Sequence, residues 1–163
     1  MTALLCLCAF ITIPAPTPIT LQTFGVSVSL LLLGGKKGTC SVALYVMLGL
    51  MGLPVFSAFS SGIGYLLGPT GGFLYGFILW GILHIIAEYI CEKSDRKFRP
   101  VLTVIAGLIL CYTTGTLWFM FITHTGLTEA LLVCVAPCIL TDIVKIAISL
   151  LIAKKPKNTK LFL

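Results

Sequence analysis

The chain has 163 residues, of which 58% are hydrophobic and 10% are charged. Soluble globular domains carry about a quarter charged residues, so this composition excludes an ordinary water-soluble fold. The formal net charge of +6 does not indicate a nucleic-acid partner, because the basic residues lie beside apolar segments. We therefore expect one integral membrane domain over residues 1–163, with the lipid bilayer as its surroundings.

Apolar runs separated by glycine, proline or charge clusters predict six membrane-spanning helices. Their ranges, in chain order, are 2–13, 22–33, 39–53, 73–91, 101–123 and 137–153. The first three are short, since a helix needs roughly 20 apolar residues to cross a bilayer. The expected fold class is an all-α integral membrane protein, a six-transmembrane-helix bundle.

Ten of the eleven basic residues form three clusters, which follow the second, fourth and sixth predicted helices. The clusters are Lys36 and Lys37; Lys93, Arg96, Lys97 and Arg99; and Lys154, Lys155, Lys157 and Lys160. If the helices alternate in direction, all three clusters lie on one side of the membrane, which the positive-inside rule makes cytoplasmic. We expect a multi-pass protein of the cytoplasmic (inner) membrane with both termini cytoplasmic.

The connections on the opposite side, 14–20, 54–72 and 124–136, contain no Lys or Arg, and the first two are apolar and rich in Gly and Pro. An irregular segment at a membrane face needs protein or a water-lined cavity to satisfy its backbone polar groups. We expect these outer loops to fold back over the bundle and cover an outward-facing pocket. A re-entrant plug without a ligand is the alternative.

Gln22 stands at the outer start of the second predicted helix, and its amide can both donate and accept hydrogen bonds. A helix-end cap is an equally good explanation of this residue. Several aromatic residues lie on or beside the outer half of the predicted bundle. They are Phe56, Tyr65, Phe73, Tyr75 and Trp118. An interfacial belt is their ordinary explanation, and two or three of them could line a ligand site.

His84 and Glu88 are four residues apart on the fourth predicted helix and form half of a familiar metal-site pattern. No second ligand lies at a matching spacing, and the seven cysteines include no CxxC pair. We therefore expect neither a metal site nor a disulfide framework. The string GGKKGT has the wrong order for a phosphate-binding loop, so no ATP site is expected in this chain.

Asp142 and Lys145 are opposite charges inside the sixth predicted helix, and their spacing of three places them on one face. Lys145 lies nine residues before Lys154, about 13 Å along a helix, which is too far for its side chain to reach the cytoplasmic interface. Pro137 indicates a helix start nearby, so the pair lies near the outer end. An intramembrane ion pair costs several kcal/mol and is a functional candidate, with a packing salt bridge as the alternative.

Several longer motifs resemble one family over roughly residues 11–155. They are ITIPAPTPITLQTFGVSVSLLLLGGKKG, YVMLGLMGLPVFSAFSSG, LLGPTGGFLYGF, GTLWF and PCILTDIVK. In order and spacing they are similar to the BioY family, the substrate-binding (S) subunits of energy-coupling-factor (ECF) biotin transporters. Two features depart from that pattern: Leu140 and Thr141 stand where Pro-Gly is expected, and the N-terminus is shorter than is usual in the family. Ala3, Cys6 and Ala9 are the small residues of the first helix that the resemblance leaves for docking on a coupling protein.

The resemblance implies a non-enzymatic protein that binds biotin with high affinity for uptake, in an outward-facing pocket under loops 14–20 and 54–72. It also implies an ECF transmembrane coupling protein and ATPase subunits as partners, with a homo-oligomer left open. No catalytic residue and no cofactor are expected, since biotin is the transported substrate. The expected substrate-binding residues are Asp142, Lys145, Gln22, Thr20, Phe56, Gly72, Tyr75 and Trp118.

The chemistry of biotin suits these polar residues. Lys145 could pair with the valerate carboxylate, Asp142 could accept a ureido N–H, and Gln22 could meet the remaining ureido atoms. Which polar group meets which end stays open at this point. An S component for another small vitamin is one alternative, and a membrane-embedded enzyme or scaffold built on His84 and Glu88 is another.

Overall fold

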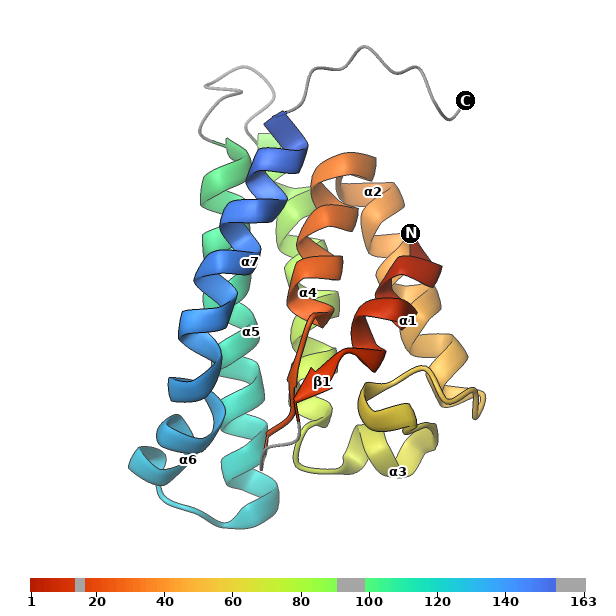
Figure 1. Cartoon of the computed structure of the whole chain (residues 1–163). Helices are drawn as coiled ribbons and strands as arrows, with labels where there is room; N and C mark the ends of the chain where they lie inside the picture. The colour runs from red at the N-terminus through yellow and green to blue at the C-terminus, as the bar shows by residue number, and fades with distance from the viewer. Residues whose placement is uncertain (14–16, 91–98, 155–163) are drawn as a thin grey trace.

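The computed structural model describes residues 1–13, 17–90 and 99–154, almost all of them in helices (Figure 1). The elements in chain order are α1 (Thr2–Phe10), β1 (Thr12–Ile13), β2 (Ile19–Thr20), α2 (Gln22–Leu50), the 3-10 helix η1 (Ser57–Phe59), α3 (Gly62–Leu67), α4 (Gly71–Ile90), α5 (Arg99–Thr123), α6 (Leu127–Cys134) and α7 (Ala136–Lys154). By length and composition, α2, α4, α5 and α7 are each able to cross a membrane. The expected all-helical fold is thus observed, with one small exception at β1 and β2, while four helices of the described residues, rather than the six expected, are long and apolar enough to span a membrane.

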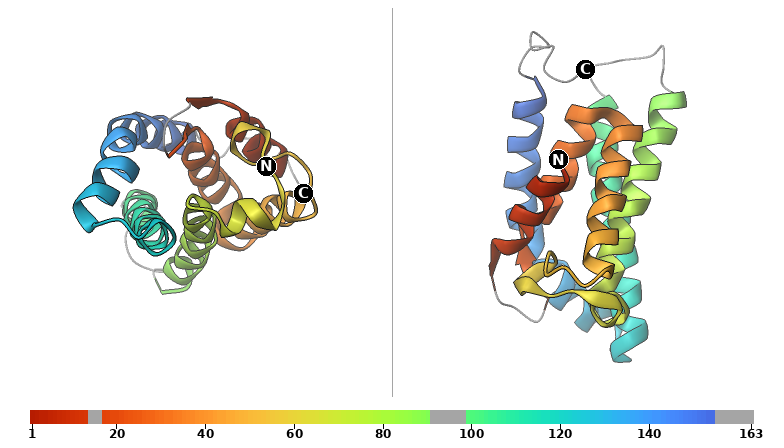
Figure 2. Two further views of the ribbon diagram at one scale, coloured as in Figure 1. Left: turned by 90° about the horizontal axis from the view of Figure 1, so that it is seen from below. Right: turned by 90° about the vertical axis from the view of Figure 1, so that its right-hand side faces the viewer.

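Helix α2 is a helical hairpin with its reversal at Gly34. The φ of Gly34 is +80°, which glycine adopts without the steric cost of a Cβ atom. The side chains of Gln22 and Tyr45 are hydrogen-bonded at 2.6 Å, although 23 residues of straight helix would separate them by about 34 Å. The two arms, 22–33 and 35–50, therefore lie side by side (Figure 2, right). Two helices were predicted here, but the second begins four residues earlier than expected and ends at Leu50 rather than at residue 53.

The first predicted helix, 2–13, is too long, because α1 ends at Phe10. Thr12 and Ile13 instead pair antiparallel with Thr20 and Ile19. Ile13 precedes a proline in the sequence, and the residue before proline disfavours helical backbone. The prediction of purely helical structure is wrong at this point, and the short strand pair brings residues 19–20 back beside the end of α1.

The outer connections contain more regular structure than their glycine and proline content predicted. Connection 54–72 holds η1 and α3, and connection 124–136 holds α6, while residues 14–16 of connection 14–20 lie outside the described residues. Phe56 is fully buried, with its ring 5.2 Å from that of Tyr65 and 5.7 Å from that of Tyr45. Gly49 faces the same ring, where a Cβ atom would clash. Connection 54–72 is therefore packed against the second arm of α2.

The two ends of the bundle are different in character. The Gly34 turn of α2, the end of α4, the start of α5 and the end of α7 lie together at one end, and α3, α6 and the strands lie at the other (Figure 1). The first end carries the basic residues Lys36, Lys37, Arg99 and Lys154. The remaining members of the predicted basic clusters, Lys93, Arg96, Lys97, Lys155, Lys157 and Lys160, lie outside the described residues.

Candidate functional site

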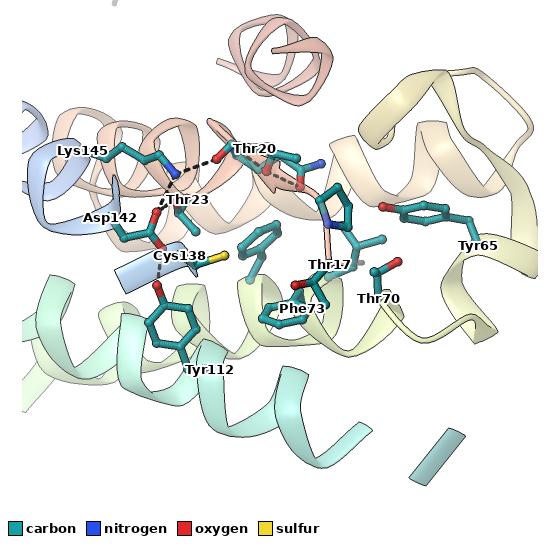
Figure 3. Close-up of a pocket in the computed structure, with 14 residues that line it drawn as sticks. Thr17, Thr20, Thr23, Tyr65, Thr70, Phe73, Tyr112, Cys138, Asp142 and Lys145 are labelled. Carbon is teal, nitrogen blue, oxygen red and sulfur yellow. Dashed lines mark hydrogen bonds and ion pairs between the residues drawn. The ribbon is translucent and has the colours of Figure 1, made fainter. Parts of the chain in front are cut away.

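A buried ion pair lies on α7, as the three-residue spacing predicted. The Lys145 ammonium lies 2.6 Å from Oδ1 of Asp142, and the two residues are 8% and 2% exposed. Both side chains point from α7 into the space between that helix, α2 and α5 (Figure 3). A carboxylate and an ammonium in such surroundings stay charged only where other groups replace their hydration.

Three helices supply hydrogen bonds to the Asp142 carboxylate. Thr23 on α2 donates its hydroxyl to Oδ1 at 2.9 Å, and Tyr112 on α5 donates to Oδ2 at 2.6 Å. Together with Lys145 on α7, these donors leave neither carboxylate oxygen without a partner. Hydrogen bonds to a charged group are worth about 1.5–3 kcal/mol each, so this arrangement fixes the carboxylate and the contact of the three helices.

Lys145 also ties the chain segment before α2 to α7. Its ammonium donates to the backbone carbonyl of Thr20 at 2.8 Å and reaches Oγ1 of Thr141 at 3.4 Å. Further along the same segment, Thr17 is buried and donates its hydroxyl to the carbonyl of Val133 at 2.6 Å. We call residues 17–20 the strap, because they cross from α6 to the ion pair and are held at both ends.

The amide of Gln22 is engaged within the protein. Its Nε2 donates to the hydroxyl of Tyr45 at 2.6 Å, and its Oε1 accepts from the hydroxyl of Thr20 at 3.1 Å. Gln22 thus links the strap to the second arm of α2. The sequence left open whether Gln22 caps the start of its helix or contacts a ligand. Gln22 is the first residue of α2, and its side chain lines the cavity described next.

The cavity lies beside the ion pair, between the strap, α4, α5 and α7. It is lined by Thr17, Pro18, Thr20, Gln22, Thr23, Tyr65, Thr70, Phe73, Leu74, Phe77, Tyr112, Cys138, Asp142 and Lys145 (Figure 3). Its volume is about 50 Å³, enough for a few water molecules at about 10–15 Å³ each. One end is polar, at the ion pair, and the middle is walled by phenylalanine and leucine side chains.

Four of the eight expected substrate-binding residues line this cavity, namely Asp142, Lys145, Gln22 and Thr20. The other four pack elsewhere. Phe56 lies in the core against Gly49, and the backbone of Gly72 lies against Trp118. The rings of Tyr75 and Trp118 meet edge to face at 5.3 Å, and the indole N–H donates to the carbonyl of Gly68 at 3.0 Å. A binding role for these four stays a prediction.

Sequence reasoning missed Tyr112, Thr23, Thr17 and Cys138, which all line the cavity. Thr23 and Cys138 are small, weakly polar residues of a kind common in membrane helices, and Thr17 lies in an irregular segment before α2, so nothing local distinguishes these three. Tyr112 lies 30 residues from its partner Asp142. A tyrosine in the middle of an apolar helix was a usable signal, because its hydroxyl needs a partner when it is buried.

His84 and Glu88 lie at the opposite end of the bundle from the cavity. Nε2 of His84 is 3.8 Å from the Glu88 carboxylate, which also accepts the backbone N–H of Gly35 at 2.8 Å. Arg99 approaches the same carboxylate at 3.9 Å. Among the described residues, no group of three or more His, Cys, Asp or Glu side chains could hold a metal ion. Glu88 therefore joins the turn of α2 to α4 and α5.

The chemistry available at the cavity is recognition of a small, mostly apolar molecule with hydrogen-bonding groups at one end. The Asp142–Lys145 pair offers an acceptor and a donor side by side, and its total charge is zero. Two phenylalanine rings and Leu74 offer apolar surface next to them. This combination of an apolar wall and a few convergent polar groups is typical of ligand sites.

Comparison with known proteins gives consistent findings. A family model described as the BioY family matches residues 1–160. A curated relative from Thermotoga maritima, named biotin transporter BioY, is 40% identical over 158 residues, which cover 96% of this chain and 91% of the relative. Another from Pyrococcus horikoshii, named probable biotin transporter BioY, is 39% identical over 140 residues, which cover 86% of this chain and 80% of the relative.

A solved structure also resembles the chain. It is the 2.1 Å crystal structure of the S-component for biotin from an ECF-type ABC transporter, with a TM-score of 0.83 and 28% sequence identity. The likeness covers 93% of this chain and 84% of that one. The arrangement of the helices is therefore shared over nearly the whole molecule.

Proposed function

The chain belongs to the BioY family, and we propose from this premise that it binds biotin in the cavity beside Asp142 and Lys145 and delivers it for uptake as the S component of an ECF-type transporter. Family membership confirms the resemblance found in the sequence and the prediction of a transport protein rather than an enzyme. The observation that carries the binding site is the buried ion pair facing the cavity. A pocket that pairs every polar atom of a small ligand can reach nanomolar affinity, about 12 kcal/mol.

The charge balance of the site favours one orientation of biotin. Lys145 is already neutralised by Asp142 at 2.6 Å, so a ligand carboxylate placed there would meet an anion as well as a cation. The ureido group is neutral and carries both N–H donors and a carbonyl acceptor. We therefore place the ureido group at the ion pair, with N–H donated to Asp142 and the carbonyl facing Lys145. The valerate then extends toward the hydroxyl groups of Tyr65 and Thr70 at the other side of the cavity.

Biotin binding requires the strap to move. A cavity of about 50 Å³ is well below the roughly 300–1,000 Å³ typical of small-molecule sites. Two hydrogen bonds attach the strap to α6 and α7, from Thr17 to Val133 and from Lys145 to Thr20. Lys145 thus connects the ligand site directly to the segment that would open and close over it.

The membrane arrangement that we propose has six inserted segments: α1, the two arms of α2, α4, α5 and α7. The nine residues of α1 extend only about 14 Å, so this segment reaches part of the way across. The end of the bundle with Lys36, Lys37, Arg99 and Lys154 faces the cytoplasm of a cytoplasmic membrane, which puts the biotin cavity at the outer face. The C-terminus is then cytoplasmic, and Met1 at the start of α1 points toward the cytoplasmic side without reaching it.

Transport itself needs a source of energy beyond this chain. The fold shared with a biotin S-component supports a transmembrane coupling protein and ATPase subunits as partners. Uptake of labelled biotin, measured in a host with and without ECF coupling proteins, tests this part. Equal uptake in both hosts would show that the chain works without them.

The binding site is tested by removing the ion pair from purified protein. Lys145→Ala should weaken biotin binding at least tenfold, or about 1.4 kcal/mol, because Lys145 no longer donates to the ligand or holds the strap. Loss of one partner also leaves a buried charge, which destabilises the fold by about 3–5 kcal/mol. The double variant Asp142→Asn with Lys145→Met carries no charge there, so its folding is easier to keep. It should lose biotin binding to a similar extent, measured by calorimetry.

Glu129→Gln is the matched control, since it removes an exposed acidic charge at the same end of the bundle. It should bind biotin as the unchanged protein does. Normal binding by the folded double variant would remove the ion pair from the site while leaving biotin as the ligand. Binding of thiamine or riboflavin in place of biotin would overturn the choice of vitamin.

The proposed orientation of biotin is tested separately with chemically modified ligands. Biotin methyl ester should bind within a few-fold of biotin, whereas an analogue methylated on a ureido nitrogen should bind at least tenfold more weakly. The opposite order of the two analogues would place the carboxylate at the ion pair.

A further inference from the structure

A second hollow lies at the end of the bundle opposite to the biotin cavity. It has a volume of about 420 Å³ and is formed between the Gly34 turn of α2 and the last turns of α4. Lys36 and Lys37 line one side, and Ile85 and Tyr89 line the other. No part of the biotin site reaches this hollow, so the proposed transport function gives it no role.

The acidic group in this hollow is already used by the protein. The Glu88 carboxylate accepts the N–H of Gly35 at 2.8 Å and lies 3.9 Å from the Arg99 guanidinium. A Cβ atom at Gly35 would meet Glu88 and the backbone of Ile85, so the turn is packed closely on α4. The carboxylate is thereby committed to holding the turn, and its charge is balanced locally.

The two lysines of the hollow are exposed and project from the start of the second arm of α2. Neither forms an ion pair with any residue in the described ranges 1–13, 17–90 and 99–154. With Glu88 balanced by Arg99, the described residues that line the hollow carry an excess of two positive charges. Its chemistry therefore suits a phosphate group or another small anion.

Tyr89 lines the hollow together with the lysines and is 84% exposed. The neighbouring face of the last turns of α4 is apolar and exposed as well, since Ile90 is 74% exposed and Ile86 is 51% exposed. In a membrane-spanning helix such a surface faces acyl chains, while two adjacent lysines sit at the level of the headgroups. A free phosphate ion would use only the lysines, whereas an anionic phospholipid would use both surfaces.

We propose that this hollow is a binding site for the headgroup of an anionic phospholipid of the same leaflet, with its phosphate on Lys36 and Lys37 and an acyl chain along the apolar side of α4. Basic pockets between helices at the cytoplasmic face are suited to anionic lipids, which are concentrated in that leaflet. The bound lipid bridges the turn of α2 and the end of α4, and it adds to the join made by Glu88.

The experiment is native mass spectrometry of the purified full chain with equal, limiting amounts of phosphatidylglycerol and phosphatidylcholine. The unchanged protein should retain phosphatidylglycerol at least fivefold better. The variant Lys36→Gln with Lys37→Gln should lose most of this preference, since each lysine near the surface contributes about fivefold. Lys154→Gln is the matched control, because it removes a lysine at the same end of the bundle but outside the hollow. Biotin binding, measured on each variant, verifies that it is folded.

Several results would overturn the proposal. They are equal retention of the two lipids by the unchanged protein, an equal loss of preference in Lys154→Gln, and full displacement of the lipid by inorganic phosphate. The last of these would assign the hollow to a free anion. If the double variant does not fold, photo-crosslinking of diazirine phosphatidylglycerol to the unchanged protein decides the matter. Crosslinks within 33–37 or 85–90 support the site, and crosslinks elsewhere alone contradict it.

Discussion

Asp142 shows how a charged side chain is kept inside an apolar helix. Its carboxylate accepts from a threonine, a tyrosine and a lysine that come from three different helices. Each of these donors replaces part of the hydration that the carboxylate loses on burial, and the lysine also neutralises its charge. In the proposed site, the same contacts fix the direction in which the carboxylate accepts a ligand N–H.

Tyr112→Phe should weaken biotin binding about tenfold. The change removes the hydroxyl that donates to Oδ2 of Asp142, and a hydrogen bond to a charged group is worth about 1.5–3 kcal/mol. Calorimetric titration measures the affinity, with Tyr89→Phe at the opposite end of the bundle as the control. A lower melting temperature with unchanged affinity would show that Tyr112 supports only the fold.

Cys138 gives a direct report of ligand in the cavity. Its side chain lines the cavity beside Tyr112 and Asp142, whereas Cys40 is exposed on the outside of α2. Saturating biotin should slow the alkylation of Cys138 by a maleimide and leave the rate at Cys40 unchanged, as measured by peptide mass spectrometry. Equal rates at Cys138 with and without biotin would argue that the vitamin binds elsewhere.

Cys134 on α6 is an internal reference for this experiment. Burial raises the pKa of its thiol to about 11, so at pH 8 only about one thiol in a thousand is the reactive thiolate. Because the thiol stays protonated up to a higher pH, the alkylation of Cys134 should be slow at pH 8. The alkylation rate should rise about tenfold for each pH unit up to pH 10, as the thiolate fraction rises. Fast labelling at pH 8 would mean that α6 opens readily.

At the scale of the elements, the strap lines the cavity but is attached to the rest of the bundle by few hydrogen bonds. Its described residues 17–20 include two residues of strand β2, paired with only two residues of β1. Thr17 and Lys145 supply the hydrogen bonds to α6 and α7, and the Thr20 hydroxyl donates to Gln22 at the start of α2. Such a segment can open without unfolding the helices that carry the ion pair.

Thr17→Val should therefore raise the dissociation rate of biotin by about two- to tenfold. The change keeps the shape of the side chain but removes the hydrogen bond to Val133, worth about 0.5–1.5 kcal/mol. Thr113→Val is the control, since that exposed hydroxyl bonds only to carbonyls of its own helix. Stopped-flow release of a fluorescent biotin gives both rates. An unchanged dissociation rate in Thr17→Val would mean that the strap does not hold the ligand in place.

Across the whole molecule, Lys36, Lys37, Arg99 and Lys154 lie at one end of the bundle, and the cavity with Lys145 lies toward the other. This separation predicts the topology, because positively charged segments stay on the cytoplasmic side during insertion. A fluorescent protein fused to the C-terminus should fluoresce in cells, and alkaline phosphatase fused at the same place should be inactive. Active phosphatase would reverse the orientation and put the cavity beside Asp142 and Lys145 on the cytoplasmic side.

Hydropathy and charge in the sequence were sufficient for the membrane class, for most helix positions and for the ion pair on α7. These properties are local, since a helix places residues three apart on one face in any protein. The motifs also led to the family. The sequence predicted Gln22 at a helix start, but its partner Tyr45 lies across the α2 hairpin. The spacing of Asp142 and Lys145 could not reveal Tyr112, Thr23 or the strap.

Those partners depend on which helices are neighbours and how each is rotated about its axis, and this is set by packing over the whole bundle. The reversal at Gly34 brings the ends of α2 together, and the strand pair ends α1 early. The tertiary structure therefore determines which groups surround the ion pair. The sequence by itself determines the ion pair, because its two residues lie three apart on one helix.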